Sequence, residues 1–295
     1  MQQGRSYAYP VLAVGVAAVS WAAILIREAD APALVIAAYR LGLAAVPTGA
    51  LALATGRRRT SSRDGLWAWP FLAGAFLALH FGFWIASLQQ TSVVTSVVLV
   101  TTNPLFVGLA SPLVLRERVS AATWAGIGIA TVGAAIMAAE DVGEGLGTVV
   151  GDLYALLGAV FGAGYLMIGR RARPQMSWVG YVGVVYSVAA VLLVMSVLAA
   201  REPFTGYSTK TFVMLGLLAL VPQLVGHSAI NWALAYVPAA LVAVAILGEA
   251  VGATILAALV LKETPSGFEV AGALLVLTAV YVALRPGRVP AAGLG

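Results

Sequence analysis

A stretch that occurs twice decides the fold of this chain: LVLRERVSAATWAG at residues 113–126 and LVLKETPSGFEVAG at residues 259–272. The two copies lie 146 residues apart, and the segments before them align at the same offset. This alignment places Asn103 and the following proline on Glu249 and the following alanine. The chain is therefore expected to contain two related halves, which is the signature of an internal repeat.

The composition indicates that these halves lie in a membrane. Hydrophobic residues make up 61% of the chain and charged residues only 10%, and the mean hydropathy is +0.96. A soluble domain carries roughly 25% charged residues, so most of this surface is expected to face lipid. Turn residues and charges divide the chain into ten continuous apolar stretches, at about 11–26, 34–54, 66–88, 93–115, 122–139, 151–168, 178–199, 211–235, 239–261 and 268–284. The sequence predicts an all-α integral membrane protein with ten transmembrane helices.

Five helices in each half make the second half enter the membrane upside down. The expected first repeat is 1–139 and the second is 148–285, with an acidic extracytoplasmic loop at 140–147 between them and a tail at 286–295. With the N-terminus inside, twelve basic residues fall in cytoplasmic segments, namely Arg5, Arg57, Arg58, Arg59, Arg63, Arg116, Arg118, Arg170, Arg171, Arg173, Arg285 and Arg288. Only four, Arg27, Arg201, Lys210 and Lys262, fall outside. This bias predicts that both termini are cytoplasmic.

Inverted repeats are the architecture of many secondary transporters, which bind their substrate near the membrane midplane between the repeats. The basic residues lie in short loops and set orientation, so no nucleic-acid partner is expected. The chain has no cysteine, which excludes disulfides and thiolate metal sites. The first stretch is expected to be retained, because no cleavage site follows it.

Several residues resemble the EamA-type transporters of the drug/metabolite transporter superfamily. The first half has Trp21, Arg40, Asn103-Pro104, Leu115-Arg116-Glu117 and Gly126; the second has Gly151-Asp152, Leu261-Lys262-Glu263 and Gly272. The resemblance implies two inverted five-helix repeats around a central cavity, with no cofactor. Ala250 and Phe161 depart from the proline and tryptophan common in the family. The aromatic third stretch with His80 is most similar to the YddG-type exporters, which implies export of aromatic and other neutral amino acids.

The polar residues inside the apolar stretches are the candidate site. Glu249 and Asn103 lie near the middle of equivalent stretches, where a charge is costly. Glu249 is expected to hold either a substrate ammonium group or a coupling proton; a protonated carboxyl bonded to a neighbouring helix is the structural alternative. Pro104 and Pro112 are expected to interrupt the same stretch as Asn103, either to shape a cavity or for packing alone.

Two helix faces and two single residues complete the candidate set. Gln223, His227 and Asn231 recur every four residues and share one face, which looks at a cavity or makes helix-to-helix hydrogen bonds. His80, Phe83 and Trp84 share an aromatic face, which either packs against neighbouring helices or forms a cavity wall suited to a zwitterion with an apolar side chain. The two histidines lie at different expected depths, too far apart for one metal ion. The remaining two candidates each carry an alternative: Arg40 pairs with a substrate carboxylate or snorkels outward, and Trp21 joins the cavity or anchors the helix at the interface.

Three other functions stay open. One is export of a different small metabolite or drug, and another is a structural membrane protein. The third is an intramembrane enzyme that uses Gly226-His227-Ser228, although no metal-hydrolase motif is present. The favoured interpretation is a non-enzymatic exporter of small neutral metabolites in a bacterial inner membrane. Alternating access is expected, and coupling to protons is open.

Overall fold

The computed structural model describes residues 2–55, 68–91, 93–138, 145–262 and 266–284. The basic residues 57–63, Glu263, the tail after 285 and most of the predicted acidic loop lie outside these described residues. All regular structure in the described part is helical. The elements are α1 (Gln2–Val19), α2 (Ala22–Glu28), α3 (Ala33–Ala54), α4 (Ala68–Leu88), α5 (Val93–Val100), α6 (Asn103–Val114), α7 (Ala121–Ala138), α8 (Gly145–Ala172), η2 (Arg173–Gln175), α9 (Trp178–Ala200), α10 (Thr209–Leu218), η3 (Ala219–His227), α11 (Ser228–Ala233), α12 (Ala239–Ile246), α13 (Gly248–Leu256), η4 (Ala257–Leu261) and α14 (Gly267–Leu284).

The described helices have the length and composition of a multi-pass membrane protein. Eight helical stretches are long and apolar enough to cross a membrane. Two further apolar helices, Ala121–Ile136 within α7 and Val270–Ala283 within α14, are shorter. Large aliphatic side chains point outward, and Leu113 and Leu259, which are equivalent in the repeat, are 84% and 72% exposed. Lipid rather than water solvates such a surface.

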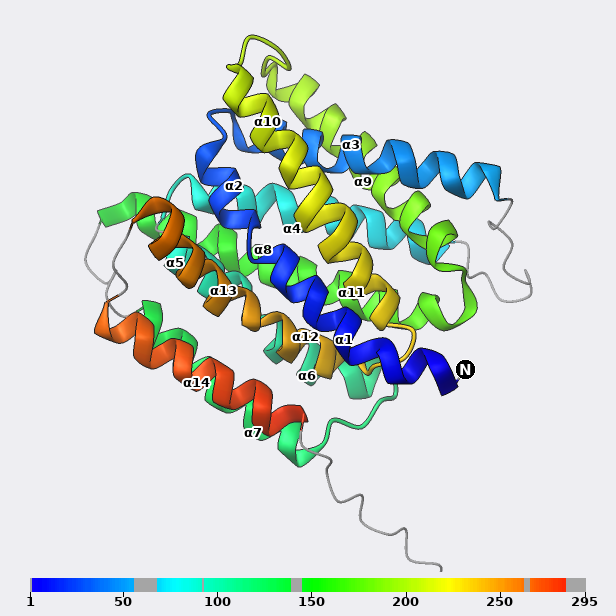
Figure 1. The fold of residues 1–295 in the computed structure, drawn as a ribbon, viewed down its shortest axis with the longest axis vertical. Coiled ribbons are helices and arrows are strands. Elements are labelled where there is room, and N and C mark those ends of the chain that lie inside the picture. The colour runs from blue at the N-terminus through cyan, green and yellow to red at the C-terminus, as the bar shows by residue number, and fades with distance from the viewer. Residues whose placement is uncertain (1, 56–67, 92, 139–144, 263–265, 285–295) are drawn as a thin grey trace, which may run out of the picture.

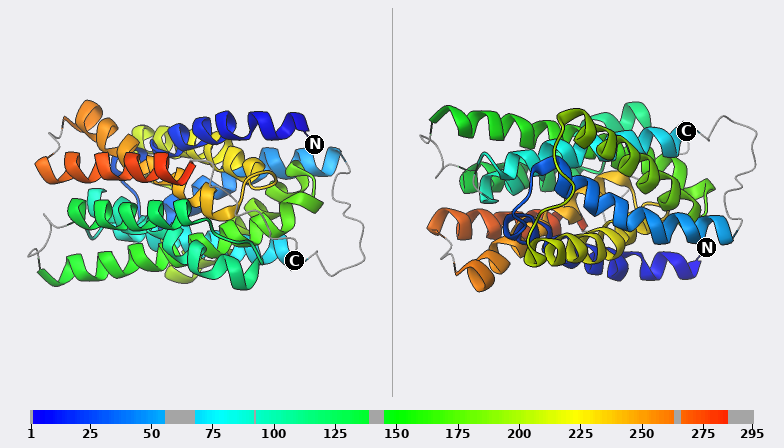
Figure 2. Two further views of the ribbon diagram at one scale, coloured as in Figure 1. Left: turned by 90° about the horizontal axis from the view of Figure 1, so that it is seen from below. Right: turned by 90° about the horizontal axis from the view of Figure 1, so that it is seen from above.

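Pairs of packed helices repeat between the two parts of the chain. α4 packs along α8, and the corresponding pair is α1 against η3 and α11. α3 packs along α9, and α7 packs along α14; each of these pairs joins two helices that the repeat makes equivalent. Figure 1 shows α7 and α14 side by side at one edge, and in Figure 2 the helices run along roughly one direction. An added Cβ at Gly126 of α7 would lie 2.8 Å from the Ala279 carbonyl oxygen, so glycine permits this close approach.

The repeat is also visible in the backbone. Arg116 follows the end of α6 with φ 56°, and Lys262 follows η4 with φ 58°. These residues lie 146 positions apart, the offset of the repeat. A left-handed residue commonly ends a helix, but glycine usually occupies it. Two equivalent non-glycine residues therefore share an uncommon conformation.

Several spanning stretches are broken near their middle. α1 gives way to α2 at Ser20-Trp21, α5 to α6 at Thr101-Thr102, and α12 to α13 at Leu247. Between α10 and α11, η3 is π-helical and contains Pro222. The expectation of an interruption at Pro112 was wrong, because α6 continues through it to Val114; membrane helices tolerate a proline where neighbouring groups satisfy the backbone carbonyl that it frees. The predicted acidic loop is also shorter than expected, since α8 begins at Gly145.

Candidate functional site

A small cavity lies where the broken helices meet. Its volume is about 30 Å³, enough for a few water molecules. Small-molecule sites usually measure roughly 300–1,000 Å³, so the cavity must widen before it can hold a small molecule. It is lined by His80, Trp84, Val100, Thr101, Asn103, Gly162, Tyr165, Leu166, His227, Ile230, Ile246 and Glu249. Five of the predicted site residues, His80, Trp84, Asn103, His227 and Glu249, are therefore brought together.

Asn103 and Glu249 occupy equivalent places at the starts of half-helices. Asn103 is the first residue of α6 and Glu249 the second residue of α13. Asn103 is 6% exposed and Glu249 is 9% exposed. The amino-terminal end of a helix carries partial positive charge, which favours a carboxylate such as that of Glu249. The Asn103 Oδ1 atom is buried and has no hydrogen-bond partner.

The His80 ring is fixed by α8. Its Nδ1 atom lies 2.8 Å from the carbonyl oxygen of Gly158. Because a carbonyl only accepts, Nδ1 donates the proton in this bond. Gly162, one turn further, leaves room for the ring, since an added Cβ would lie 2.9 Å from Nδ1. The ring also stacks on Trp84 with a centroid distance of 6.0 Å.

Both expected roles, cavity lining and helix-to-helix hydrogen bonding, are found on the face that carries Gln223, His227 and Asn231. His227, in η3, lines the cavity, and its Nδ1 atom is buried without a partner. Gln223 accepts a hydrogen bond from Arg40, and Asn231 donates to the Tyr165 hydroxyl. Neither Gln223 nor Asn231 belongs to the cavity lining. Pro222 lacks the N–H that a regular helix needs, which is the physical reason for an irregular turn at this point.

Arg40 does not snorkel, so that expectation was wrong. The side chain is 0% exposed, and its Nε atom donates to Gln223 Oε1 at 2.8 Å. Its guanidinium carbon lies 3.9 Å from the centre of the Phe81 ring and 5.8 Å from that of Trp84. Such a cation–π contact stabilises a desolvated charge. Arg40 therefore lies directly behind the Trp84 wall of the cavity.

Three other candidates lie outside the cavity. Phe83 lines a surface groove of about 500 Å³ together with Leu79 and Gly82, and it stacks on Phe161 with an interplanar angle of 5°. Trp21 lies at the break between α1 and α2 and is 39% exposed. Pro104, in the first turn of α6, supports the break beside the cavity without lining it. The predicted aromatic face thus divides between the cavity and the surface groove.

The sequence did not single out Tyr165, Thr101 or Gly162 as cavity residues. Tyr165 is 2% exposed and accepts the Asn231 hydrogen bond at the cavity wall. The spacing of Gly158 and Gly162 had indicated only close helix packing. That spacing was the available signal for Gly162 as a cavity residue, because a glycine pair on one helix can also make room for a histidine ring on the neighbouring helix.

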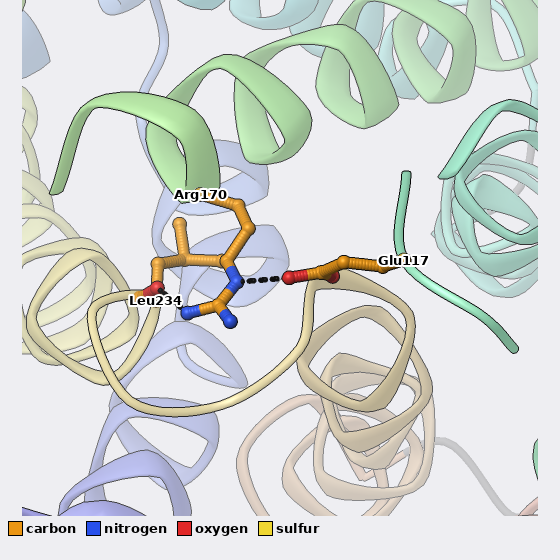
Figure 3. A network of polar contacts seen from close by, with 3 residues as sticks. All are labelled: Glu117, Arg170 and Leu234. Atoms are coloured by element: carbon orange, nitrogen blue, oxygen red, sulfur yellow. Dashed lines mark hydrogen bonds and ion pairs between the residues drawn. The ribbon is translucent and has the colours of Figure 1, made fainter. Parts of the chain in front are cut away.

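An ion pair joins α8 to the segment that follows α6. Arg170, near the end of α8, donates from Nε to Glu117 Oε1 at 2.6 Å and from Nη1 to the Leu234 carbonyl at 2.9 Å (Figure 3). Near the end of α2, Arg27 Nη1 donates to the Leu88 carbonyl at 3.0 Å. Leu88 and Leu234 lie 146 residues apart. Equivalent helix ends are thus held by an arginine in both parts of the chain.

Ser228, which the enzyme alternative requires as nucleophile, is engaged in a different way. It is 2% exposed, and its Oγ atom lies 3.1 Å from the hydroxyl oxygen of Tyr186. A second contact joins it to the Gln223 carbonyl at 3.4 Å. A serine nucleophile needs a base within hydrogen-bond reach, and tyrosine is a weak base for this purpose. The arrangement is that of a helix-packing hydrogen bond.

Comparison with known proteins places this geometry in a known group. A model of the EamA-like transporter family matches residues 6–139 and 149–285. A solved structure titled only "Crystal structure of protein" superposes with a TM-score of 0.76 at 20% identity, covering 95% of this chain and 97% of that chain. This likeness concerns the fold alone. No curated protein matches the sequence.

Proposed function

Because this chain belongs to the EamA-like transporter family, we propose that it exports small neutral metabolites, above all aromatic and other neutral amino acids. Transport proceeds by alternating access through the central cavity, between repeats at 1–139 and 148–285. Support comes from one observation: aromatic rings and uncharged polar groups converge with a single carboxyl group on one cavity. The aromatic rings suit an apolar side chain, and the polar groups suit the charges of an amino acid.

The Arg170–Glu117 ion pair indicates which end of the transporter is closed in this conformation. The Arg170–Glu117 pair joins α8 to the segment after α6. With both termini on the cytoplasmic side of a bacterial inner membrane, as the loop charges favour, this pair closes the cytoplasmic end. Alternating access then requires that the pair separates when substrate enters from inside.

Coupling to protons is proposed at Glu249. This carboxyl is the acidic group of the cavity lining, and its surroundings include Arg40, His80, His227 and Tyr165. A carboxylate in a site that opens alternately to each side can carry a proton in one direction. Binding of a proton and binding of a substrate ammonium compete for the same oxygens, which gives exchange rather than co-transport.

Reconstitution tests the proposal. Purified protein in liposomes is loaded with unlabelled L-phenylalanine, and uptake of labelled L-phenylalanine by counterflow is measured. We expect accumulation that is competed by other neutral amino acids and not by sugar phosphates. Absence of counterflow for every neutral amino acid would exclude the proposed substrate class. Export itself is tested in cells, where expression should lower the accumulation of a toxic phenylalanine analogue.

A further inference from the structure

Buried polar atoms without partners gather around the cavity. They are Nη1 and Nη2 of Arg40, Nε1 of Trp84, Oδ1 of Asn103, Nε2 of Gln223 and Nδ1 of His227. Buried polar groups in proteins are normally hydrogen-bonded. Six such atoms in and beside one cavity leave hydrogen-bonding capacity for a bound ligand.

The unpartnered donors gather around Arg40. Its Nε atom is used by Gln223, while Nη1 and Nη2 remain free. A guanidinium edge with two free nitrogens matches the two oxygens of a carboxylate. Arginine stays charged even when it is buried. Trp84 Nε1 and Gln223 Nε2 are donors as well, so this side of the site offers only hydrogen-bond donors to a ligand anion.

The acceptors lie on the other helices. Glu249 and Asn103 line the cavity at the starts of α13 and α6. Asn103 Oδ1 is an unpartnered acceptor. The Arg40 and Glu249 charges act on one another, yet no ion pair within 4 Å joins these two described residues. Arg40 and Glu249 are therefore not directly paired, and Trp84 contacts the guanidinium and lines the same cavity as Glu249.

We propose that Arg40 binds the α-carboxylate of the substrate and that Glu249, with Asn103, binds its α-ammonium. This assignment rests on the proposed function and names the substrate class more closely, as α-zwitterions with both charges present. Trp84 lines the cavity and lies against the guanidinium, so its ring must move aside as the cavity expands. A ligand lacking one pole would leave a buried charge without a partner, which sites of this kind reject strongly.

The first test uses the wild-type protein and varies the ligand. Displacement of labelled L-phenylalanine is measured with three analogues: L-phenylalaninamide lacks the carboxylate, 3-phenylpropionate lacks the ammonium, and phenethylamine lacks the carboxyl carbon altogether. Each analogue is expected to compete at least ~100-fold more weakly than L-phenylalanine. Competition by the amide within about threefold of L-phenylalanine, on the affinity scale, would overturn the carboxylate assignment.

The second test varies Arg40. Arg40→Lys keeps the charge but loses the two-pronged geometry, and it should weaken L-phenylalanine binding by at least about tenfold while leaving competition by phenylalaninamide unchanged. Equal weakening of both ligands would mean that Arg40 only supports the structure. Arg173→Lys is the matched control, because Arg173 is also buried and binds backbone carbonyls of Asn231 and Met176. That control should leave the preference for the free carboxylate intact.

The two proposals fail in different ways. If the folded wild-type protein binds no amino acid, the proposed function fails and the assignment fails with it. If it binds L-phenylalanine and also accepts the amide equally well, only the assignment of Arg40 fails. Arg40→Gln is a stronger test, and its size-exclusion profile shows whether it folds. If Arg40→Gln does not fold, the wild-type ligand series and Arg40→Lys still test whether Arg40 binds the carboxylate.

Discussion

In the proposed mechanism, energy coupling depends on one residue, Glu249. It lies at the start of α13 and lines the cavity. Its equivalent in the first repeat is Asn103, which cannot take up a proton. The two halves thus share a backbone arrangement at these equivalent positions, but only the second half has an ionisable side chain there.

Replacing Glu249 tests whether proton coupling is lost while substrate flux remains. Glu249→Gln keeps the shape and a hydrogen-bonding group but removes the titratable oxygen pair. We expect its phenylalanine flux to be the same with and without a pH gradient, and its affinity for the substrate to fall. Flux is measured in liposomes with a clamped internal pH. Retention of the gradient dependence would exclude Glu249 as the coupling site, and Asn103→Asp serves as the equivalent substitution in the first repeat.

His80 depends on two glycines of α8 for its position. Gly162→Ala would place a methyl group 2.9 Å from the ring and should lower stability by about 1–3 kcal/mol. The loss should appear as a lower melting temperature in detergent and weaker substrate binding. Gly216→Ala in α10 is the control, because nothing lies within 4 Å of its added Cβ. An unchanged melting temperature in Gly162→Ala would mean that the His80 contact is not tight.

Single polar residues were predictable where their surroundings made them stand out. Glu249, Asn103, His80 and His227 were found because each is a polar group in an apolar stretch, and the repeat pairs Asn103 with Glu249. The sequence indicated Arg40 as a candidate but not its contacts. Its partners Gln223 and Phe81 are remote in sequence, and hydropathy does not show them. Tyr165 was missed because a tyrosine in an aromatic membrane helix has no distinctive spacing.

At the scale of helices, broken segments rather than straight ones shape the site. The breaks before Asn103 and Glu249 bring half-helix starts to the cavity, and η3 turns His227 toward it. Pro104 indicated the break between α5 and α6, and Pro222 explains the irregular helix η3. The break at Leu247 could not be read from the sequence, since Ala250 stands where its repeat equivalent is Pro104. The break therefore forms in the second half without a proline at the equivalent position.

The left-handed residues at the ends of α6 and η4 allow a matched test of helix termination. Arg116→Gly should be neutral or stabilising by up to about 1 kcal/mol, because a non-glycine residue in this conformation is strained. Arg118→Gly, which removes the same charge two residues later without a positive φ, should give no gain. Reversible unfolding in detergent measures both. A loss of stability in Arg116→Gly beyond that of Arg118→Gly would show that the arginine side chain itself holds the turn.

At the scale of the whole molecule, the Arg170–Glu117 pair is expected to set the balance between conformations. The side chains are 20% and 24% exposed, so the pair is worth about 1 kcal/mol at most. Glu117→Gln should therefore raise the population open to the cytoplasm by up to about fivefold. A single cysteine at Ile246, in the cavity wall, reports this as faster labelling from that side.

The control for this experiment is another ion pair of the same kind. Lys210 and Glu28 form a salt bridge in which Lys210 is 64% exposed. Lys210→Gln should leave the labelling rate of the Ile246 cysteine unchanged. If Glu117→Gln behaves like Lys210→Gln, the Arg170–Glu117 pair is a surface contact that has no part in gating.

Membrane orientation is testable because the natural chain has no cysteine. Gln175, the last residue of η2, and Thr205, between α9 and α10, are both exposed. In intact cells, a membrane-impermeant maleimide should label Thr205→Cys and should label Gln175→Cys only after the membrane is broken. The reverse pattern would invert the orientation deduced from the loop charges. It would also move the Arg170–Glu117 pair to the outer end.

The small volume of the cavity has a consequence for the affinity of the protein for its substrate. A space of about 30 Å³ holds only a few water molecules, and a phenylalanine molecule is much larger. Under the proposed function, binding and widening of the cavity must therefore occur together. Part of the binding free energy is used to widen the cavity, which lowers the apparent affinity of the conformation described.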